Sequence, residues 1–173
     1  MTGFSSLDGE QTFPWLPSGP ALLFAPADRP ERFQKAAERS DMVIIDLEDG
    51  AAVDNHEQAR ANIINNPLDP ETTILRITGP GTPTFAEDVA FARACDYDIV
   101  MVPKIRDSIP AELEGLKIIA MIETPQAMIN IQQIATHPDV VGLFWGAEDL
   151  TAELGGVSSR QSVDENPRRH YRD

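Results

Sequence analysis

The chemistry of this chain is indicated by charged residues that follow short apolar runs. The clearest example is the segment Met42 to Gly50. It begins with four apolar residues, and three carboxylates, Asp46, Glu48 and Asp49, follow within four positions. A mostly β-branched run of this length is typical of a strand buried on both faces of a parallel sheet. Acids this close repel one another unless a cation or several donors lie among them. The stretch predicts either a charged site at a strand end or a solvated acidic turn. If the strand continues through these residues, alternation places Asp46 and Glu48 on one face of the sheet and Asp49 on the other.

The same pattern recurs along the chain and favours the charged site. Packing alone gives no reason for charged residues to gather at the C-terminal end of an apolar run, yet almost every run in this chain is followed by at least one. The residues concerned are Asp28, Arg29, Asp46, Glu48, Asp49, Arg76, Lys104, Glu123, Glu148 and Asp149. Because α/β barrels build their active sites at the carboxyl ends of their strands, we predict that these residues share one active-site rim.

Two of these carboxylates, Glu123 and Asp149, follow consecutive predicted strands. Mg²⁺ is commonly held by one or two carboxylates and keeps its other positions for water and substrate. The pair therefore predicts a magnesium site. The alternative is that one or both residues only cap the helices that follow.

The cations on the rim have several possible partners. Arg76 ends a predicted buried strand, where its planar guanidinium suits a substrate carboxylate. The alternative is a salt bridge to Glu48 or Asp49, and both interpretations can hold together. Lys104 is an electrophile, a Schiff-base amine or an ion-pair partner of the acids, and the ion pair is favoured because no aromatic or glycine-rich surroundings support a covalent role. A metal next to an arginine suits cleavage or formation of a carbon–carbon bond beside a keto group.

Six strand-and-helix units in series must position these residues. Strands are predicted at residues 21–25, 42–47, 73–77, 99–102, 117–122 and 140–144. N-cap signals at Asp54, Thr84 and Thr124 precede three helices, the last running from 125 to 135 with Met128 on its buried face. The absence of hairpin signals indicates parallel βα architecture.

The expected fold class is α/β, a TIM (β/α)8-type barrel. A doubly wound nucleotide fold is disfavoured because the turn after the first strand, residues 26–30, has no glycine. Six units do not close an eight-stranded barrel, so we expect a barrel truncated after about six βα units, without its last two units and C-terminal segment. The expected organisation is an irregular N-terminal arm at 1–20 and a partial barrel domain at 21–173.

Composition excludes several classes of partner. With Lys+Arg 14 and Asp+Glu 28, the 173-residue chain has a formal net charge of -14, which disfavours nucleic acid and anionic membrane surfaces. No apolar run approaches the roughly 20 residues of a membrane span, and no secretory signal is evident. Cys95 is the only cysteine, which excludes an intrachain disulfide and is compatible with a cytoplasmic location.

Six segments, in order between residues 21 and 160, resemble those of citrate lyase β-subunit-like proteins. They are LLFAPADRPERF, VIIDLEDG, ILRI, VMVPK, AMIETP and GLFWGAEDL. These proteins belong to the HpcH/HpaI aldolase family, which also includes malyl-CoA and citramalyl-CoA lyases. The resemblance implies an eight-stranded α/β barrel in a homotrimer or homohexamer. It also implies that a catalytic aspartate is supplied to a neighbouring subunit by a segment beyond residue 173.

The resemblance further implies a role for each residue on the rim. Glu123 and Asp149 hold Mg²⁺, Arg76 binds the substrate carboxylate, and Glu48 and Asp49 position Arg76 or a metal-bound water. Further substrate contacts, including the acyl-CoA entrance, are expected from Asp28, Arg29, Lys104, Gly146, Ala147 and the Gly155-Gly156 loop.

The expected function is that of a magnesium-dependent carbon–carbon lyase. It cleaves or forms a 3-hydroxyacyl-CoA such as citryl-CoA, malyl-CoA or citramalyl-CoA, with acetyl-CoA and a 2-oxo acid as the other reaction partners. One alternative is a class II aldolase-type lyase on free 2-oxo acids. The other is a truncated barrel that only binds a dicarboxylate or assembles with other subunits.

Overall fold

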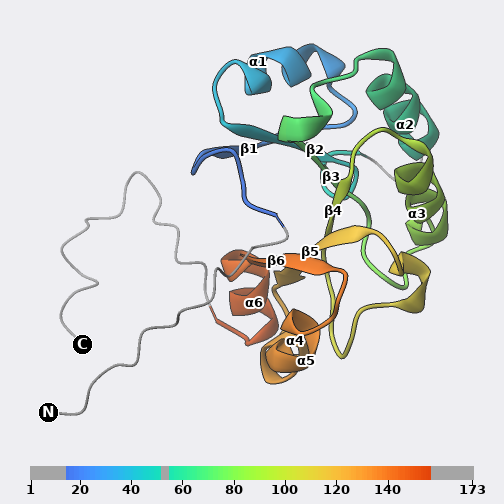
Figure 1. The fold of residues 1–173 in the computed structure, drawn as a ribbon. Coiled ribbons are helices and arrows are strands. Elements are labelled where there is room, and N and C mark those ends of the chain that lie inside the picture. The colour runs from blue at the N-terminus through green and yellow to red at the C-terminus, as the bar shows by residue number, and fades with distance from the viewer. Residues whose placement is uncertain (1–14, 52–54, 157–173) are drawn as a thin grey trace, which may run out of the picture.

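The computed structural model describes residues 15–51 and 55–156 of the 173-residue chain. Its six strands form one parallel sheet in the order of the sequence, β1-β2-β3-β4-β5-β6 (Figure 1). Their bounds are β1 (Leu22–Pro26), β2 (Met42–Asp46), β3 (Thr73–Arg76), β4 (Ile99–Val102), β5 (Lys117–Ile122) and β6 (Val140–Trp145). The six predicted strands are confirmed to within a residue at each end. The expected cap Asp54 and most of the expected arm lie outside the described residues.

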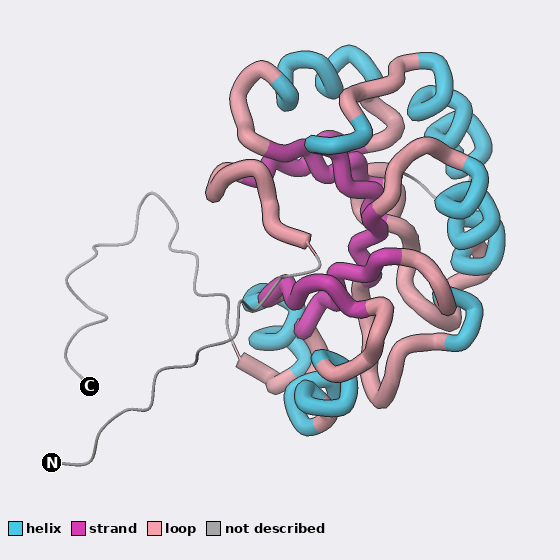
Figure 2. Tube along the Cα trace, in the orientation of Figure 1, coloured by secondary structure: helices cyan, strands magenta, loops and turns pink. Residues whose placement is uncertain are grey.

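Helices cover the outer, convex side of the curved sheet, as Figure 2 shows. They are η1 (Pro30–Arg32), α1 (Phe33–Ala37), α2 (His56–Asn65), η3 (Pro70–Thr72), α3 (Phe85–Ala94), η4 (Ala111–Leu113), α4 (Pro125–Ile129), α5 (Ile131–Ala135) and α6 (Ala147–Glu153). None of the helices in the described part of the chain is long and apolar enough to cross a membrane. The βα architecture of the barrel class is confirmed.

The two faces of the sheet carry separate apolar clusters. On the outer face, Val43 and Ile45 of β2 belong to the larger cluster, which includes helix residues such as Phe33 and Ala59. The inner cluster consists of Met42, Ile44, Ile74, Ile99, Met101, Ile119 and Met121. Because side chains alternate along a strand, Asp46 shares the inner face with the second cluster. The inner face therefore changes from apolar to charged towards the carboxyl ends of the strands.

Aromatic rings bring the two edge strands of the sheet together. Phe24 of β1 meets Phe144 of β6 edge-on, with ring centroids 6.0 Å apart. Trp15, from the segment before β1, packs against the inner cluster. The six strands thus curl around one interior, although β1 and β6 do not pair with each other in the described structure.

Three expectations about the helices were wrong. The helix expected over 125–135 is interrupted at Asn130, whose side-chain amide donates to Arg106 O at 3.3 Å and to Asp107 Oδ1 at 3.4 Å. Met128 is 37% exposed and not buried. Thr84 occupies the N-cap position of α3 but makes no capping bond, because its backbone is helical (φ -91°, ψ -8°) and not extended as an N-cap residue usually is. Its hydroxyl donates instead to Thr78 Oγ1 at 3.2 Å.

The third cap signal is confirmed at Thr124. Its buried hydroxyl accepts from the backbone N–H of Ala127 at 3.0 Å, which satisfies one of the free donors at the start of α4. The same hydroxyl donates to Ile105 O at 2.9 Å. Thr124 thereby ties α4 to the loop that follows β4.

Candidate active site

Arg76 lies at the end of β3, directly beside Asp46 in the register of β2 and β3. Its Nε donates to Asp46 Oδ1 at 2.8 Å and its Nη2 to Asp46 Oδ2 at 2.6 Å. Both side chains are buried. A two-point pair of this kind fixes the plane of the guanidinium as well as its position. The sequence prediction missed Asp46 as the main partner of Arg76, although neighbouring parallel strands that both end in a charge give a signal for it.

Two further carboxylates reach the outer edge of the same guanidinium. Arg76 Nη1 lies 3.0 Å from Glu48 Oε2, and Nη2 lies 3.1 Å from Asp49 Oδ2. The salt bridges predicted for Arg76 are confirmed for both acids. Placing Asp49 on the opposite face was wrong, because β2 ends at Asp46 and the chain then bends, with Glu48 N donating to Asp46 Oδ1 at 3.0 Å.

Phe24 provides an aromatic contact to Arg76 that the sequence prediction also missed. The guanidinium carbon lies 4.8 Å from the centroid of its ring. A cation over an aromatic face is attracted by the ring quadrupole. Arg76 is thus held by Asp46 from the side of β2 and by Phe24 from β1.

The pKa of Glu48 is raised from its ordinary value of 4.5 to about 7. Burial is the largest cause, and the nearby charges of Asp49 and Glu123 act in the same direction against the opposing effect of Arg76. Burial acts to lower the pKa of Arg76, but its bonds and charge interactions with Asp46 reverse that and raise it. Arg76 stays charged, whereas Glu48 gains and loses its proton near neutral pH.

The second part of the site is centred on Lys104, which follows β4. Its Nζ lies 2.5 Å from Asp149 Oδ2 and 3.5 Å from Glu123 Oε1. Its backbone N–H also donates to Glu123 Oε1, at 2.8 Å. The ion-pair interpretation of Lys104 is confirmed. Since Glu123 and Lys104 both act on the pKa of Glu48, the two parts form one electrostatic environment.

Glu123 is a buried carboxylate, 1% exposed. Burial raises its pKa in spite of the bonds from Lys104. Gly146, the N-cap residue of α6, lies directly against it, because a Cβ added there would come within 2.4 Å of Glu123 Cβ and 2.6 Å of Oε2. Glycine is therefore required for the backbone of the β6–α6 turn to approach Glu123 this closely.

The donor set around Lys104 fits a magnesium ion. Glu123 and Asp149 contact one and the same ammonium group, so their oxygens converge on a single cation position. Mg²⁺ prefers oxygen ligands and is often bound through only one or two carboxylates. No group of three or more His, Cys, Asp or Glu residues suited to a metal occurs in the described ranges. The remaining ligands would have to be water or substrate.

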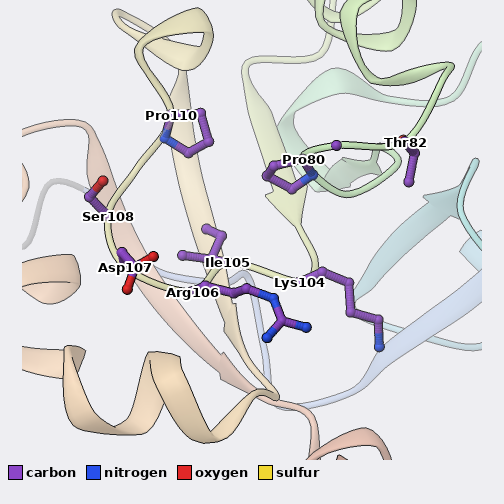
Figure 3. Close-up of a pocket in the computed structure, with 9 residues that line it drawn as sticks. Pro80, Thr82, Lys104, Ile105, Arg106, Asp107, Ser108 and Pro110 are labelled. Carbon is purple, nitrogen blue, oxygen red and sulfur yellow. The ribbon is translucent and has the colours of Figure 1, made fainter.

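A cavity of about 480 Å³ adjoins Lys104 (Figure 3). The β3–α3 loop, with Pro80 and Thr82, faces the loop after β4 across it. Its lining residues are Pro80, Gly81, Thr82, Lys104, Ile105, Arg106, Asp107, Ser108 and Pro110. Arg106 Nη2 lies 3.1 Å from Glu153 Oε1, which connects this loop to α6.

The remaining predicted site residues are less closely joined to this centre. Asp28 and Arg29 form an exposed pair with each other, with Oδ1 and Nε 3.6 Å apart. The backbone N–H of Asp28 donates to Gly50 O at 3.1 Å, so the turn after β1 lies beside the turn that carries Glu48 and Asp49. Ala147 begins α6 next to Gly146.

Comparison with known proteins places the chain in a family. The sequence profile of the HpcH/HpaI aldolase/citrate lyase family matches residues 21–165. A citrate lyase subunit beta-like protein from Mycobacterium tuberculosis is 45% identical over 146 residues, covering 84% of this chain and 54% of the relative. An L-malyl-CoA/beta-methylmalyl-CoA lyase from Cereibacter sphaeroides is 34% identical over 157 residues, covering 77% of this chain and 49% of the relative.

A solved structure shares the fold. The crystal structure of protein CitE from Mycobacterium tuberculosis in complex with magnesium, acetoacetate and coenzyme A superposes with a TM-score of 0.78 at 45% identity, covering 84% of this chain and 55% of that chain. The chain spans about half the length of the relatives it matches. The matched residues contain both parts of the rim described above, and the chain belongs to the HpcH/HpaI aldolase/citrate lyase family.

Proposed function

We propose that this chain carries the metal-binding and carboxylate-binding part of a magnesium-dependent carbon–carbon lyase acting on a 3-hydroxyacyl-CoA. The proposal is carried by two features on one rim. The buried Arg76 guanidinium is held at two points by Asp46, and Glu123 and Asp149 converge on one cation position. The carboxyl of Glu48 interacts electrostatically with both features. The lyase among the relatives and the coenzyme A and magnesium in the CitE complex support this choice of substrate and metal.

Arg76 binds the substrate carboxylate in this proposal. Asp46 occupies the inner edge of the guanidinium and keeps it in place, while Asp49 at the outer edge has a side chain that is 77% exposed. An incoming carboxylate can therefore replace Asp49 without exposing the buried pair. The substrate carboxylate then accepts from Nη2 in place of Asp49, while Glu48 stays at Nη1.

Glu123 and Asp149 hold Mg²⁺ in this proposal. When bound, the metal polarises the oxygen of the carbonyl or alkoxide next to the bond that breaks. Gly146 keeps the turn after β6 against Glu123, so the backbone excludes water from one side of that carboxylate.

Glu48 is assigned the transfer of a proton. In the cleavage direction its ionised Oε2 takes the proton of the substrate 3-hydroxyl, the C2–C3 bond breaks, and the electrons of that bond pass to the thioester side. C2 then takes up a proton from water, and Glu48 returns the proton it took to the solvent. A carboxylate with a pKa of about 7 suits this task, because it is available in both protonation states at neutral pH.

The proposal is tested by incubating the purified protein with Mg²⁺ and each of citryl-CoA, malyl-CoA and citramalyl-CoA. The expected result is magnesium-dependent release of oxaloacetate, glyoxylate or pyruvate from one of them. Arg76→Lys keeps the charge but loses the planar fork, so it is expected to raise KM for the active substrate. Absence of product from all three thioesters, together with absence of their Mg²⁺-dependent binding, contradicts the proposal. Turnover of free oxo acids without response to a thioester supports the class II aldolase-type alternative.

We also propose, on the family resemblance, that the protein assembles as a homotrimer or homohexamer, and that it works in the cytoplasm. Light scattering after size-exclusion chromatography tests the first point, and fluorescence imaging of the tagged protein tests the second.

A further inference from the structure

We propose that Lys104 is a resident counter-ion of the metal site, which holds Glu123 and Asp149 together in the absence of metal and competes with Mg²⁺ for them. The inference rests on the proposed function, because it takes Glu123 and Asp149 as the metal ligands. It assigns to Lys104 a role in setting the metal affinity of the site.

The contacts of Lys104 are those expected of a substitute cation. Its ammonium lies 2.5 Å from Asp149 Oδ2 and 3.5 Å from Glu123 Oε1, so it occupies the position between the two carboxylates. The Glu48 carboxylate adds to the negative charge of the same environment when it is ionised. Without a cation, these carboxylates would repel one another in a partly desolvated site. One positive charge must be present there whether or not metal is bound.

The backbone of Lys104 is adapted to this position. Its φ is 55°, and among the described residues it is the only non-glycine with a positive φ. This conformation is unfavourable for a lysine, and such strain is often found at functional sites. The backbone N–H donates to Glu123 Oε1, and Gly79 packs closely enough that an added Cβ would lie 3.1 Å from Lys104 Cβ. The strain is thus offset by contacts that direct the side chain to the two acids.

Displacement of the ammonium does not require burying its charge. The side chain of Lys104 is 34% exposed, and the residue lines the cavity of about 480 Å³ between the loops after β3 and β4. The side chain can therefore turn into this water-accessible space when a divalent cation takes its place. Because two cations cannot share one position, metal binding and the ammonium contacts exclude each other.

The test measures Mg²⁺ binding by isothermal titration calorimetry, with magnesium chloride alone as the ligand. Lys104→Met removes the competing charge and keeps the apolar stem, so the Kd for Mg²⁺ is expected to fall by about tenfold, within the range common for coupled ligands. Lys104→Arg keeps the charge and is expected to bind Mg²⁺ with an affinity close to that of the unchanged protein. Lys117→Met is the matched control, since Lys117 pairs with Asp98 at the surface.

A second readout is the melting temperature. In metal-free buffer Lys104→Met is expected to melt lower than the unchanged protein, and Mg²⁺ is expected to raise its melting temperature by the larger amount. Lys104→Gln provides the same comparison if the methionine variant does not fold.

Each outcome has a distinct meaning. Tighter binding by the neutral variant supports the competition, whereas equal or weaker binding overturns it and leaves the proposed function standing, because a lysine that only holds the loop would weaken metal binding when removed. Absence of Mg²⁺ binding in the unchanged protein and in both neutral variants overturns this inference together with the metal assignment.

Discussion

Asp46 holds Arg76 through both of its carboxylate oxygens, one 2.8 Å from Nε and the other 2.6 Å from Nη2. The two residues are register partners at the ends of β2 and β3 and are both buried. The inner edge of the guanidinium is therefore neutralised by the scaffold, and the outer edge remains for groups that can be exchanged. Asp46 thus fixes the position of Arg76, while the outer edge of the guanidinium can bind another group.

Asp46→Ala is expected to destabilise the protein by about 3–5 kcal/mol, because it leaves the buried guanidinium without its main partner. Urea unfolding followed by circular dichroism measures the change. Asp98→Ala serves as the control, since Asp98 and Lys117 form a pair whose side chains are 76% and 53% exposed and whose loss should cost about 0–1 kcal/mol. A similar small loss for both variants would show that Glu48 and Asp49 suffice to hold Arg76.

The raised pKa of Glu48 predicts a pH-dependent stability. Its pKa is about 7 in the folded protein and ordinarily 4.5, so between these values the folded state keeps a proton that the unfolded chain has released. The contribution of Glu48 to stability therefore falls as the pH rises from about 4.5 to 7 and stays low above that. Glu48→Gln cannot ionise at this position, so the variant does not lose this stability. The free energy of unfolding of the variant, minus that of the unchanged protein, is therefore expected to rise as the pH rises from about 4.5 to 7.

The size of this effect is on the order of 3 kcal/mol at pH 8, from the free energy that corresponds to a pKa difference of this magnitude. Urea unfolding at intervals from pH 4.5 to 8 gives both curves. Parallel curves for Glu48→Gln and the unchanged protein would contradict the raised pKa.

The strands were predictable from sequence because each combines an apolar run with a charged end, and a parallel sheet requires both features at fixed positions. The same pattern of charged strand ends predicts Arg76, Glu123 and Asp149 on one rim. The bond between Asp46 and Arg76 was not predictable from this pattern alone, because it depends on the register between two strands whose paired residues lie 30 positions apart in the chain. The contact of Phe24 with Arg76 was not predictable either, because it depends on the curvature of the sheet.

The helix boundaries show where local patterns fail. Thr84 and Thr124 both give a cap signal in the sequence, yet only Thr124 makes the capping bond. Thr124 has the extended backbone of an N-cap residue, whereas the backbone of Thr84 is helical. At the helix break, the side-chain amide of Asn130 bonds to a loop more than twenty residues earlier. Backbone conformation and tertiary contacts of this kind are not contained in the local sequence pattern.

Thr124→Val is expected to destabilise the protein by about 1–3 kcal/mol, because it keeps the volume of the side chain while it removes both hydrogen bonds of a buried hydroxyl. Thr124→Ser retains both bonds and should cost only the burial of one methyl group, about 0.8 kcal/mol. Differential scanning calorimetry compares the three proteins. Equal losses for valine and serine would mean that the methyl contact, and not the cap, stabilises the start of α4.

Gly146→Ala is expected to disturb Glu123 specifically. The added Cβ would lie 2.4 Å from Glu123 Cβ and 2.6 Å from its Oε2, closer than any real contact, so either the carboxylate or the turn after β6 must move. Overpacking of this kind costs about 1–3 kcal/mol. If Glu123 is a magnesium ligand, the same shift should weaken Mg²⁺ binding by about 10–100-fold, the range seen when the support of a metal ligand is removed.

Gly142→Ala in β6, the strand before this turn, is the matched control for this prediction. Its added Cβ would meet Ile119 Cγ1 and a Trp15 ring atom at 3.8 Å, an ordinary contact distance, so stability should change little or increase by about 0.4–1 kcal/mol. Calorimetric titration with magnesium chloride and urea unfolding of both variants separate the two effects. Mg²⁺ binding that is unchanged in a folded Gly146→Ala protein would rule out Glu123 as a ligand whose position the turn after β6 controls.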